Sequence, residues 1–240
     1  QIVSGDLKHE NVDIEKKQLN MDRVLEDNGL VAFSHVNVVP EFESGIINIT
    51  QAHGIAGLKS NTIMFGWPEK PSRLESQLRI MRAASKAGKS TIITRLNPLQ
   101  ENNRPKQIDI WWRGLENNGD MMMMLAYLLS LNSEWKDAKI IVRSIVETKQ
   151  EHDQINSNLS DLIPEARIQA ETEIIFKPDN QTTTETMRAN SQNTDVAFLG
   201  MKDPKPGAES DYARQLIELA NGFKTSIFVR NASEFAGHLI

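Results

Sequence analysis

Short apolar runs rich in β-branched residues alternate with longer amphipathic segments along the chain. The runs predict strands at residues 2–5, 30–38, 62–67, 90–96, 108–112, 139–146, 168–176, 195–200 and 225–230. Most of these runs lack strict alternation of apolar and polar positions. That pattern is typical of strands buried on both faces of a parallel sheet.

The segments between these runs have the apolar spacing of helices. They predict helices at residues 14–27, 42–53, 72–87, 150–162, 182–189 and 208–220. Near the start of the third helix, Ser72 and Glu75 form a capping-box pattern, and Gly88 follows its last turn. Strands and helices that alternate at this spacing form βαβ units. We therefore predict an α/β fold with a mostly parallel sheet covered by helices.

A weak internal repeat predicts two similar α/β halves. The stretches that begin at Asn61 and Thr194 each read as a strand, a proline-containing loop, an amphipathic helix, a glycine turn and a strand that ends in arginine. Arg95 in the first stretch corresponds to Arg230 in the second. Between the repeats, residues 97–107 are polar, contain two prolines and have no apolar period.

This polar stretch is the best candidate for the boundary between the halves. We accordingly predict a first α/β half over residues 1–100 and a second over residues 101–240.

The segment from residue 108 to residue 142 concentrates the bulky side chains. Its apolar run, 121–129, has nine residues, whereas a membrane-spanning helix needs about 20. A helix of this length that is apolar on all sides is usually buried in a core, although methionine also suits a compliant interface. We predict that seven residues fill the core or reach an interface: Trp111, Trp112, Trp135, Met121, Met122, Met123 and Met124.

Composition narrows the function classes. The chain has 240 residues, 25% charged side chains and a net charge of −5, as in a soluble globular protein. The acidic balance disfavours nucleic acid as a partner, because nucleic-acid binding needs a concentrated basic face. The chain contains no cysteine, which excludes disulfides, thiolate catalysis and cysteine-based metal sites.

Motifs for phosphate binding and catalysis are near misses. The stretch Ala-Gly-Lys-Ser-Thr at 87–91 resembles the end of a phosphate-binding loop, but the required first glycine is Ala83. A helix precedes this stretch and a strand follows, the reverse of the required order, so we interpret it as a helix end. The glycines of the stretch 53–60 are only three residues apart, and we interpret that stretch as a turn into the next strand.

Ionisable residues give no constellation typical of an active site. The histidines, at positions 9, 35, 53, 152 and 238, have no metal-binding helical spacing. Asp109 alternates with isoleucines, which suggests a strand edge or a helix cap, and His35 and Trp67 lie near predicted strand ends, where open α/β sheets bind ligands. We predict that the chain is not an enzyme and has no catalytic residue, metal site or cofactor.

Two blocks of sequence carry a family resemblance. The first reads Ile-Asp-Ile-Trp-Trp from position 108, then a glycine, an apolar helix and Trp135-Lys136-Asp137. The second contains Gly57-Leu58-Lys59 and Gly66-Trp67. Together they resemble the C-terminal cytosolic domain of the cation-chloride cotransporters, over nearly the whole chain. The short polar loop before the first block lacks the long phosphorylatable insert of many animal members, so the chain is more similar to a prokaryotic relative.

The resemblance implies a non-catalytic regulatory and dimerising domain at the cytoplasmic face of the cell membrane, built from two halves similar to universal stress proteins. It implies two partners, a second copy of the chain and the transmembrane transport domain of the same full-length protein, which moves chloride with sodium or potassium. The chain begins at Gln1 without a signal-peptide pattern, and we expect it to be part of a longer protein. The alternatives are a nucleotide-binding sensor of the universal-stress-protein type and a freestanding stress protein.

Overall fold

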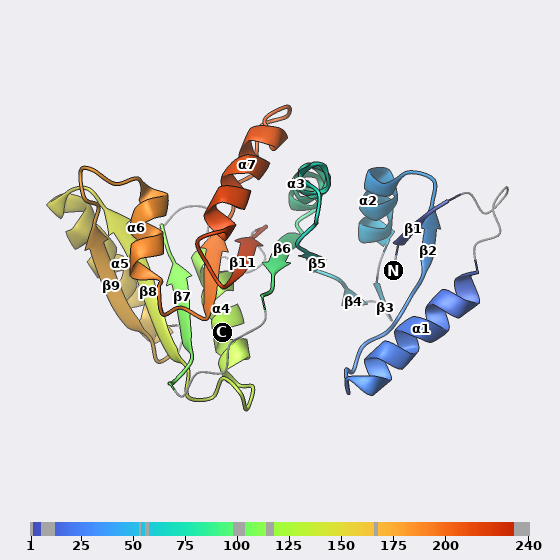
Figure 1. Ribbon diagram of the computed structural model, residues 1–240, viewed down its shortest axis with the longest axis horizontal. Coiled ribbons are helices and arrows are strands. Elements are labelled where there is room, and N and C mark those ends of the chain that lie inside the picture. Colours follow the sequence, from blue (N-terminus) through green and yellow to red (C-terminus); the bar gives the residue numbers. More distant parts are fainter. Residues whose placement is uncertain are drawn as a thin grey trace. The chain divides into compact units, whose positions relative to one another are not determined.

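Strands and helices alternate along the chain as the sequence predicts (Figure 1). The computed structural model describes residues 2–5, 13–52, 54–55, 58–97, 104–113, 118–165 and 168–232. The strands are β1 (Ile2–Ser4), β2 (Asn37–Val39), β3 (Gly54–Ile55), β4 (Leu58–Lys59), β5 (Thr62–Gly66), β6 (Ser90–Arg95), β7 (Gln107–Trp111), β8 (Lys139–Val146), β9 (Glu171–Phe176), β10 (Val196–Gly200) and β11 (Thr225–Arg230). The helices are α1 (Ile14–Asp27), α2 (Phe42–Ala52), α3 (Pro71–Lys86), α4 (Asn118–Ser130), α5 (Lys149–Glu165), α6 (Thr183–Asn190) and α7 (Glu209–Ala220).

The chain divides into two compact units, residues 1–59 and 60–240. In the first unit, β1 and β2 pair in parallel, with Ile2 opposite Asn37, and α2 packs against β1. Strands β3 and β4 form a short antiparallel pair. The order β1-α1-β2-α2 matches the order β7-α4-β8-α5 of the second unit, and the two strands are parallel in both.

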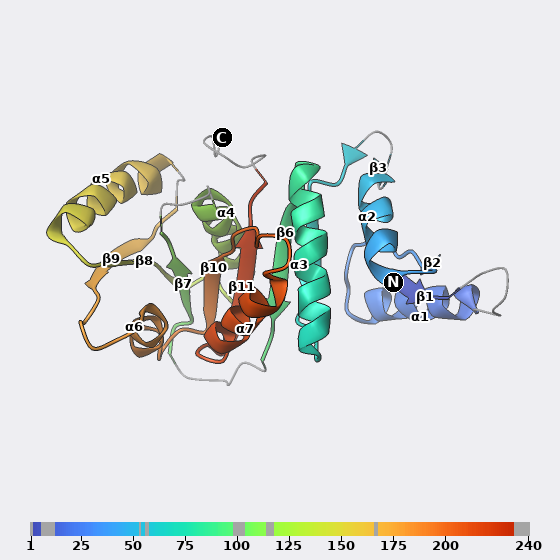
Figure 2. The same ribbon diagram turned by 90° about the horizontal axis from the view of Figure 1, so that it is seen from above.

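A seven-stranded sheet in the order β5-β6-β11-β10-β7-β8-β9 forms the centre of the second unit. All neighbouring strands are parallel except β6 and β11, which are antiparallel. Helices α4 and α5 lie on one face of the sheet, and α6 and α7 lie on the other (Figure 2). The predicted α/β fold with a mostly parallel sheet is confirmed.

Each face of the sheet has its own hydrophobic core. Because consecutive side chains of a strand point to opposite faces, the adjacent residues Trp111 and Trp112 belong to different cores. Trp112 packs with the methionines of α4 and with Leu159 of α5. Trp111 packs with residues of α3, α6 and α7. The central strands are therefore buried on both faces, as their continuous apolar runs indicate.

The internal repeat appears as two βαβ units, β5-α3-β6 and β10-α7-β11. Ile93 of β6 lies opposite Phe228 of β11. Phe228 is also the residue that corresponds to Ile93 in the second repeat. Likewise Thr91 lies opposite Arg230, and Arg95 lies opposite Ser226. This register relates the two units by a local two-fold axis that passes close to Ile93 and Phe228, and α3 packs beside α7.

Two local predictions are wrong. The sequence predicts a strand over 30–38, but only Asn37–Val39 pairs, because the neighbouring strand β1 has just three residues and an isolated apolar stretch cannot satisfy its backbone groups. The sequence also predicts a capping box at Ser72, but α3 begins one residue earlier, at Pro71, and has no side-chain cap. Proline is favoured at the first helical position, where no backbone donor is needed.

The compact units differ from the predicted halves. Strands β5 and β6 belong to the sheet of the second unit, so the boundary along the chain lies between Lys59 and Ser60. The polar connection after β6 joins two strands of one sheet, and its residues 98–103 lie outside the described part of the chain. The division into halves at residue 100 stays a prediction, based on the repeat.

Candidate functional site

The position where an open α/β sheet of this kind binds ligands lies between β7 and β10. In the order β9-β8-β7-β10-β11, the chain builds outward from β7 in one direction and then returns to add β10 on its other side. Ligands bind outside the carboxyl ends of the strands at such a switch point. Here β7 ends at Trp111 and is followed by Trp112, and β10 ends at Gly200 and is followed by Met201.

Protein side chains fill this position. Asn118, the first residue of α4, is buried, and its Nδ2 donates to the Met201 carbonyl oxygen at 2.8 Å. Its Oδ1 accepts from the Asn231 N–H, also at 2.8 Å. Gly119 lies so close to the Trp112 indole that a Cβ atom there would collide with the ring. The start of α4 is therefore packed against the chain's own groups, whereas a phosphate site would need a helix N-terminus open to its ligand.

The stretch resembling a phosphate-binding loop has a structural role, as interpreted from the sequence. Gly88 has φ of +69° after the last turn of α3, a conformation that glycine adopts without steric cost. The Lys89 side chain is buried, and its Nζ donates to the carbonyl oxygen of Ser60 at 2.6 Å and to the Ser60 hydroxyl at 3.1 Å. This lysine thus ties the start of β6 to Ser60, two residues before β5.

The bulky residues singled out in the sequence line the core. Met121, Met122 and Met123 are 1–2% exposed. The exposed fractions of Trp111, Trp112 and Trp135 are 5%, 9% and 6%. Met124 is partly buried against the core that contains Trp112 and the other methionines. Contact of any of these residues with a partner stays a prediction.

The outer side of α4 carries an apolar stripe. Tyr127, Leu128 and Leu131 are 43%, 52% and 62% exposed. With Met124 they follow the i, i+3, i+4, i+7 spacing of one helix face. We call these four residues the α4 stripe. No charged residue occurs from 121 to 131, so the stripe differs from an ordinary solvated helix face.

Asp109 is neither at a strand edge nor a helix cap, the two positions suggested from the sequence, since the groups that contact its carboxylate are side chains. It lies in β7, between β8 and β10, and is fully buried. The hydroxyls of Ser191 and Thr194, which follow α6, donate to its Oδ2, the first at 3.0 Å. The Gln107 amide donates to Oδ1 at 2.8 Å. The carboxylate is thus surrounded by donors, as a buried charge requires.

Arg143 of β8 completes this buried polar group. Its Nε lies 2.9 Å from Asp109 Oδ2, although the N–H does not point along that line and the contact is an ion pair rather than a hydrogen bond. Its guanidinium also pairs with Glu173 of β9. Sequence reasoning missed this group, because its members come from four separate segments. The one signal was an acidic residue inside an apolar strand.

The other residues noted in the sequence do not assemble into a site. Trp67 follows β5 and packs on the Phe228 ring, with 5.5 Å between ring centroids. His35 is exposed before β2, and His152 stacks on Phe176. The remaining histidines lie outside the described residues. Within the described residues, no cluster of three or more histidine or acidic side chains is suited to hold a metal ion.

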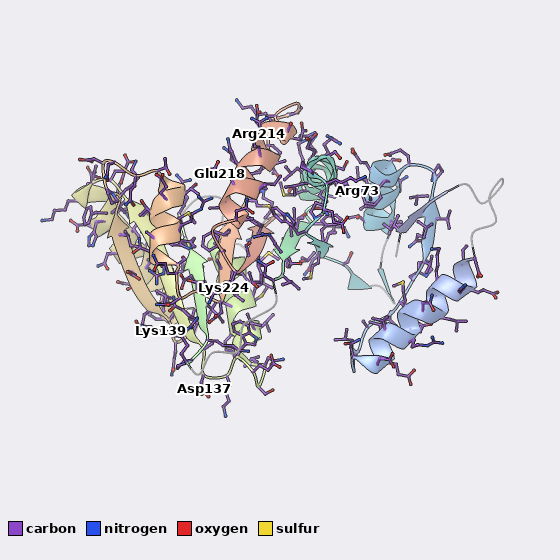
Figure 3. The ribbon with its side chains drawn as sticks, in the orientation of Figure 1. Arg73, Asp137, Lys139, Arg214, Glu218 and Lys224 are labelled. Carbon is purple, nitrogen blue, oxygen red and sulfur yellow. The ribbon has the colours of Figure 1, made fainter. Side chains whose placement is uncertain are left out.

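Several charged side chains on the surface pair with one another. Lys139 lies 2.8 Å from Glu171 across the edge of the sheet, and Lys224 lies 3.4 Å from Asp195 (both lysines are labelled in Figure 3). Asp195 also accepts two hydrogen bonds from the Arg104 guanidinium, at 2.9 and 3.0 Å. Arg104 thereby fixes the end of the polar connection to the start of β10. Among the described helices, none combines the length and apolarity that crossing a bilayer requires.

The sequence profile of solute carrier family 12 matches residues 69–209, which is more than half of the chain. The chain belongs to this family. The matched region runs from the turn before α3 to the start of α7. It includes the buried tryptophans, α4 and the Asp109 group.

Solved structures agree with this assignment. The cytoplasmic domain of a prokaryotic cation chloride cotransporter superposes with a TM-score of 0.66 at 18% identity, over 97% of this chain and 84% of that chain. A putative universal stress protein from Pseudomonas aeruginosa UCBPP-PA14 matches with a TM-score of 0.57 at 12% identity, over 98% and 83% of the two chains. A universal stress protein from Archaeoglobus fulgidus DSM 4304 gives 0.53 at 10% identity, over 97% and 85%.

These matches confirm two predictions from the sequence. The resemblance to the cytosolic domain of cation-chloride cotransporters is confirmed by the family profile and the first structure. The similarity of the fold to universal stress proteins is confirmed by the other two structures.

Proposed function

We propose that this chain is a non-catalytic regulatory domain of a chloride-coupled cation transporter, situated at the cytoplasmic face of the membrane and acting as a homodimer. The observation that carries the proposal is the family match across 69–209, together with the fold shared with the cytoplasmic domain of a cotransporter. Its second partner is the transmembrane transport domain of the same full-length protein. Such a domain controls transport only if it contacts two states of the transporter unequally.

The α4 stripe supports pairing with a second copy. In a two-fold interface the same surface occurs on both sides, so any charge there would face itself or its near neighbours. Residues 121–131 contain no charged side chain, so no charge would face its own copy across the two-fold axis. The three most exposed members of the α4 stripe are large apolar side chains. This surface is compatible with burial against itself.

Sedimentation velocity of the 240-residue chain tests the pairing. We expect the wild type to sediment as a dimer and Leu128→Glu to sediment as a monomer at the same micromolar concentration, because the substitution places two carboxylates at the two-fold contact. The matched control is Leu96→Glu, since Leu96 is a 72% exposed leucine that follows β6 and is not part of α4. A monomeric wild type, or a dimer that Leu128→Glu leaves intact, would contradict the proposed interface.

The regulatory role is tested in the full-length transporter. We expect Leu128→Glu to change chloride-dependent cation flux at equal protein abundance in the membrane, and Leu96→Glu to leave the flux unchanged. If the wild type, Leu128→Glu and Leu96→Glu had equal flux although Leu128→Glu had lost the dimer, pairing would not control transport.

The alternative, a nucleotide-binding sensor, receives no support from the described geometry. Asn118 and Trp112 occupy the space at the N-terminus of α4 where a phosphate group would bind. Calorimetric titration of the chain with ATP distinguishes the two functions. Saturable heat at micromolar concentrations would favour the sensor.

A further inference from the structure

Helix α6 has little apolar surface with which to hold itself on the sheet. It has eight residues, and its buried side chains are Thr186 and Met187. Its other apolar residue, Ala189, is exposed. By comparison, α3 buries Leu74, Leu78, Ile80, Met81 and Ala84. Isolated helices shorter than about 12 residues are marginal in water, so α6 depends on contacts outside itself.

Polar contacts at the end of α6 add to this small apolar contact. Ser191, directly after the helix, accepts from the Trp111 indole N–H at 3.1 Å and donates to Asp109 Oδ2 at 3.0 Å. Thr194 donates to the same carboxylate oxygen. Arg188 adds a bond to the Glu218 carbonyl oxygen of α7. At the other end, Thr182 and Glu185 form a capping box, which stabilises the helix itself.

The carboxylate that receives these hydroxyls is costly to bury. Desolvation of Asp109 and Arg143 opposes the closed structure, and the attraction within such a pair offsets that cost only when the remaining polar positions are satisfied. Ser191 and Thr194 satisfy two of these positions while α6 is docked. If α6 leaves, water can solvate the same groups. Docking of α6 and burial of the ion pair are therefore coupled.

The geometry points to α6 as a helix that undocks as a unit while the seven-stranded sheet stays folded, with the Ser191 and Thr194 hydroxyls on Asp109 as its latch. Undocking uncovers the Trp111 indole, Arg143 and Asp109 together. Local openings of this kind occur well below the free energy of global unfolding. The inference goes beyond the proposed function, because it holds whether or not the chain controls transport.

Hydrogen exchange followed by mass spectrometry tests the latch in the 240-residue chain. In the wild type, we expect peptides covering 183–190 to exchange faster than peptides from β7, β10 and α7. Ser191→Ala should accelerate exchange in 183–190 about tenfold, the effect of a hydrogen bond in the usual range, with rates in β10 and α7 changed less than twofold. Thr194→Val should act in the same direction, whereas Thr194→Ser, which keeps the hydroxyl, should retain wild-type rates.

Ser144→Ala is the matched control. The Ser144 hydroxyl is also buried, and it donates to the Trp112 carbonyl oxygen at 2.9 Å. Its loss should leave exchange in 183–190 unchanged relative to the rest of the chain. Wild-type α6 amides as protected as those of β10 would overturn the proposal, and so would equal acceleration of α6, α7 and β10 in Ser191→Ala.

Discussion

At the scale of single residues, the contact of Gly119 with Trp112 shows how closely α4 approaches the sheet. The indole occupies the space where any other residue would place its Cβ atom. Ala would ordinarily be the better helix former by about 1 kcal/mol. At this position the steric conflict should outweigh that preference, because Trp112 is itself fixed in a close-packed core.

We expect Gly119→Ala to lower the free energy of unfolding by about 1–3 kcal/mol, the usual cost of overpacking. Urea denaturation followed by tryptophan fluorescence measures the change. Gly66→Ala is the control, since a Cβ at Gly66 would meet no atom within 4 Å, and it should be close to neutral. A Gly119→Ala protein as stable as the wild type would show that the indole moves easily.

The sequence anticipates residues whose chemistry is apolar better than those whose role is polar. Burial of Met121, Met122 and Met123 follows from the length and uniform apolarity of the run 121–129 alone. The position of Asp109 does not, because its hydrogen-bond donors and its ion-pair partner come from β7, β8 and the loop after α6. A buried polar group is defined by partners distant in sequence, and no local pattern encodes them.

At the scale of elements, the pairing of α3 with α7 combines apolar packing with an ion pair. Arg82 of α3 donates to the Glu209 carboxylate at the start of α7. This hydrogen bond lowers the pKa of Glu209 below its ordinary value of 4.5, and hydrogen bonds from the backbone N–H groups of Glu209 and Gly207 act in the same direction. The charged form of Glu209 is therefore favoured in the folded protein.

A lowered pKa in the folded state contributes stability that is present above the pKa of the unfolded state and is lost as pH falls through the folded value. We expect Glu209→Gln to be less stable than the wild type at pH 7. The difference should shrink as pH falls below 4.5. Urea denaturation across this pH range measures it. Glu218→Gln, which changes an exposed glutamate on the same helix (Figure 3), should show no such convergence.

Element positions follow from the sequence where periodicity and neighbours agree. The bounds of α1, β8 and β11 coincide with the expected ranges, because each has a strong pattern and clear ends. Strand β2 is shorter than expected, since its length is set by β1 rather than by its own composition. The antiparallel pair β3–β4 was not anticipated, because its strands have two residues each.

At the scale of the whole molecule, the antiparallel pair β6–β11 joins the two repeats into one sheet. Ile93 and Phe228 meet at this junction and are both fully buried. The repeat is visible in the sequence, but its pairing is not, since similarity does not specify which strands become neighbours. The compact unit that results is residues 60–240 rather than either predicted half.

We expect a fragment of residues 60–240 to unfold in one cooperative transition, because it contains both cores of the sheet. A fragment of residues 101–240 lacks β5, α3 and β6, and leaves the β11 edge unpaired. Its free energy of unfolding should be lower by more than about 4 kcal/mol, since the loss of the buried Leu74 and Leu78 side chains of α3 alone costs that much. Circular dichroism in urea compares the two. Equal stability would support the division at residue 100.

The reversal of strand direction between β6 and β11 has a further consequence. The chain leaves β5 and β6 at one end of the sheet, through Trp67 and Leu96, but leaves β7 and β10 at the opposite end, through Trp112 and Met201. Equivalent loops of the two repeats therefore point away from each other, toward different surroundings. A molecule that touches one set of loops can influence the other through the strands that run between them and through α3, whose last turns contact the loop after β10 at Asp203 and Pro204.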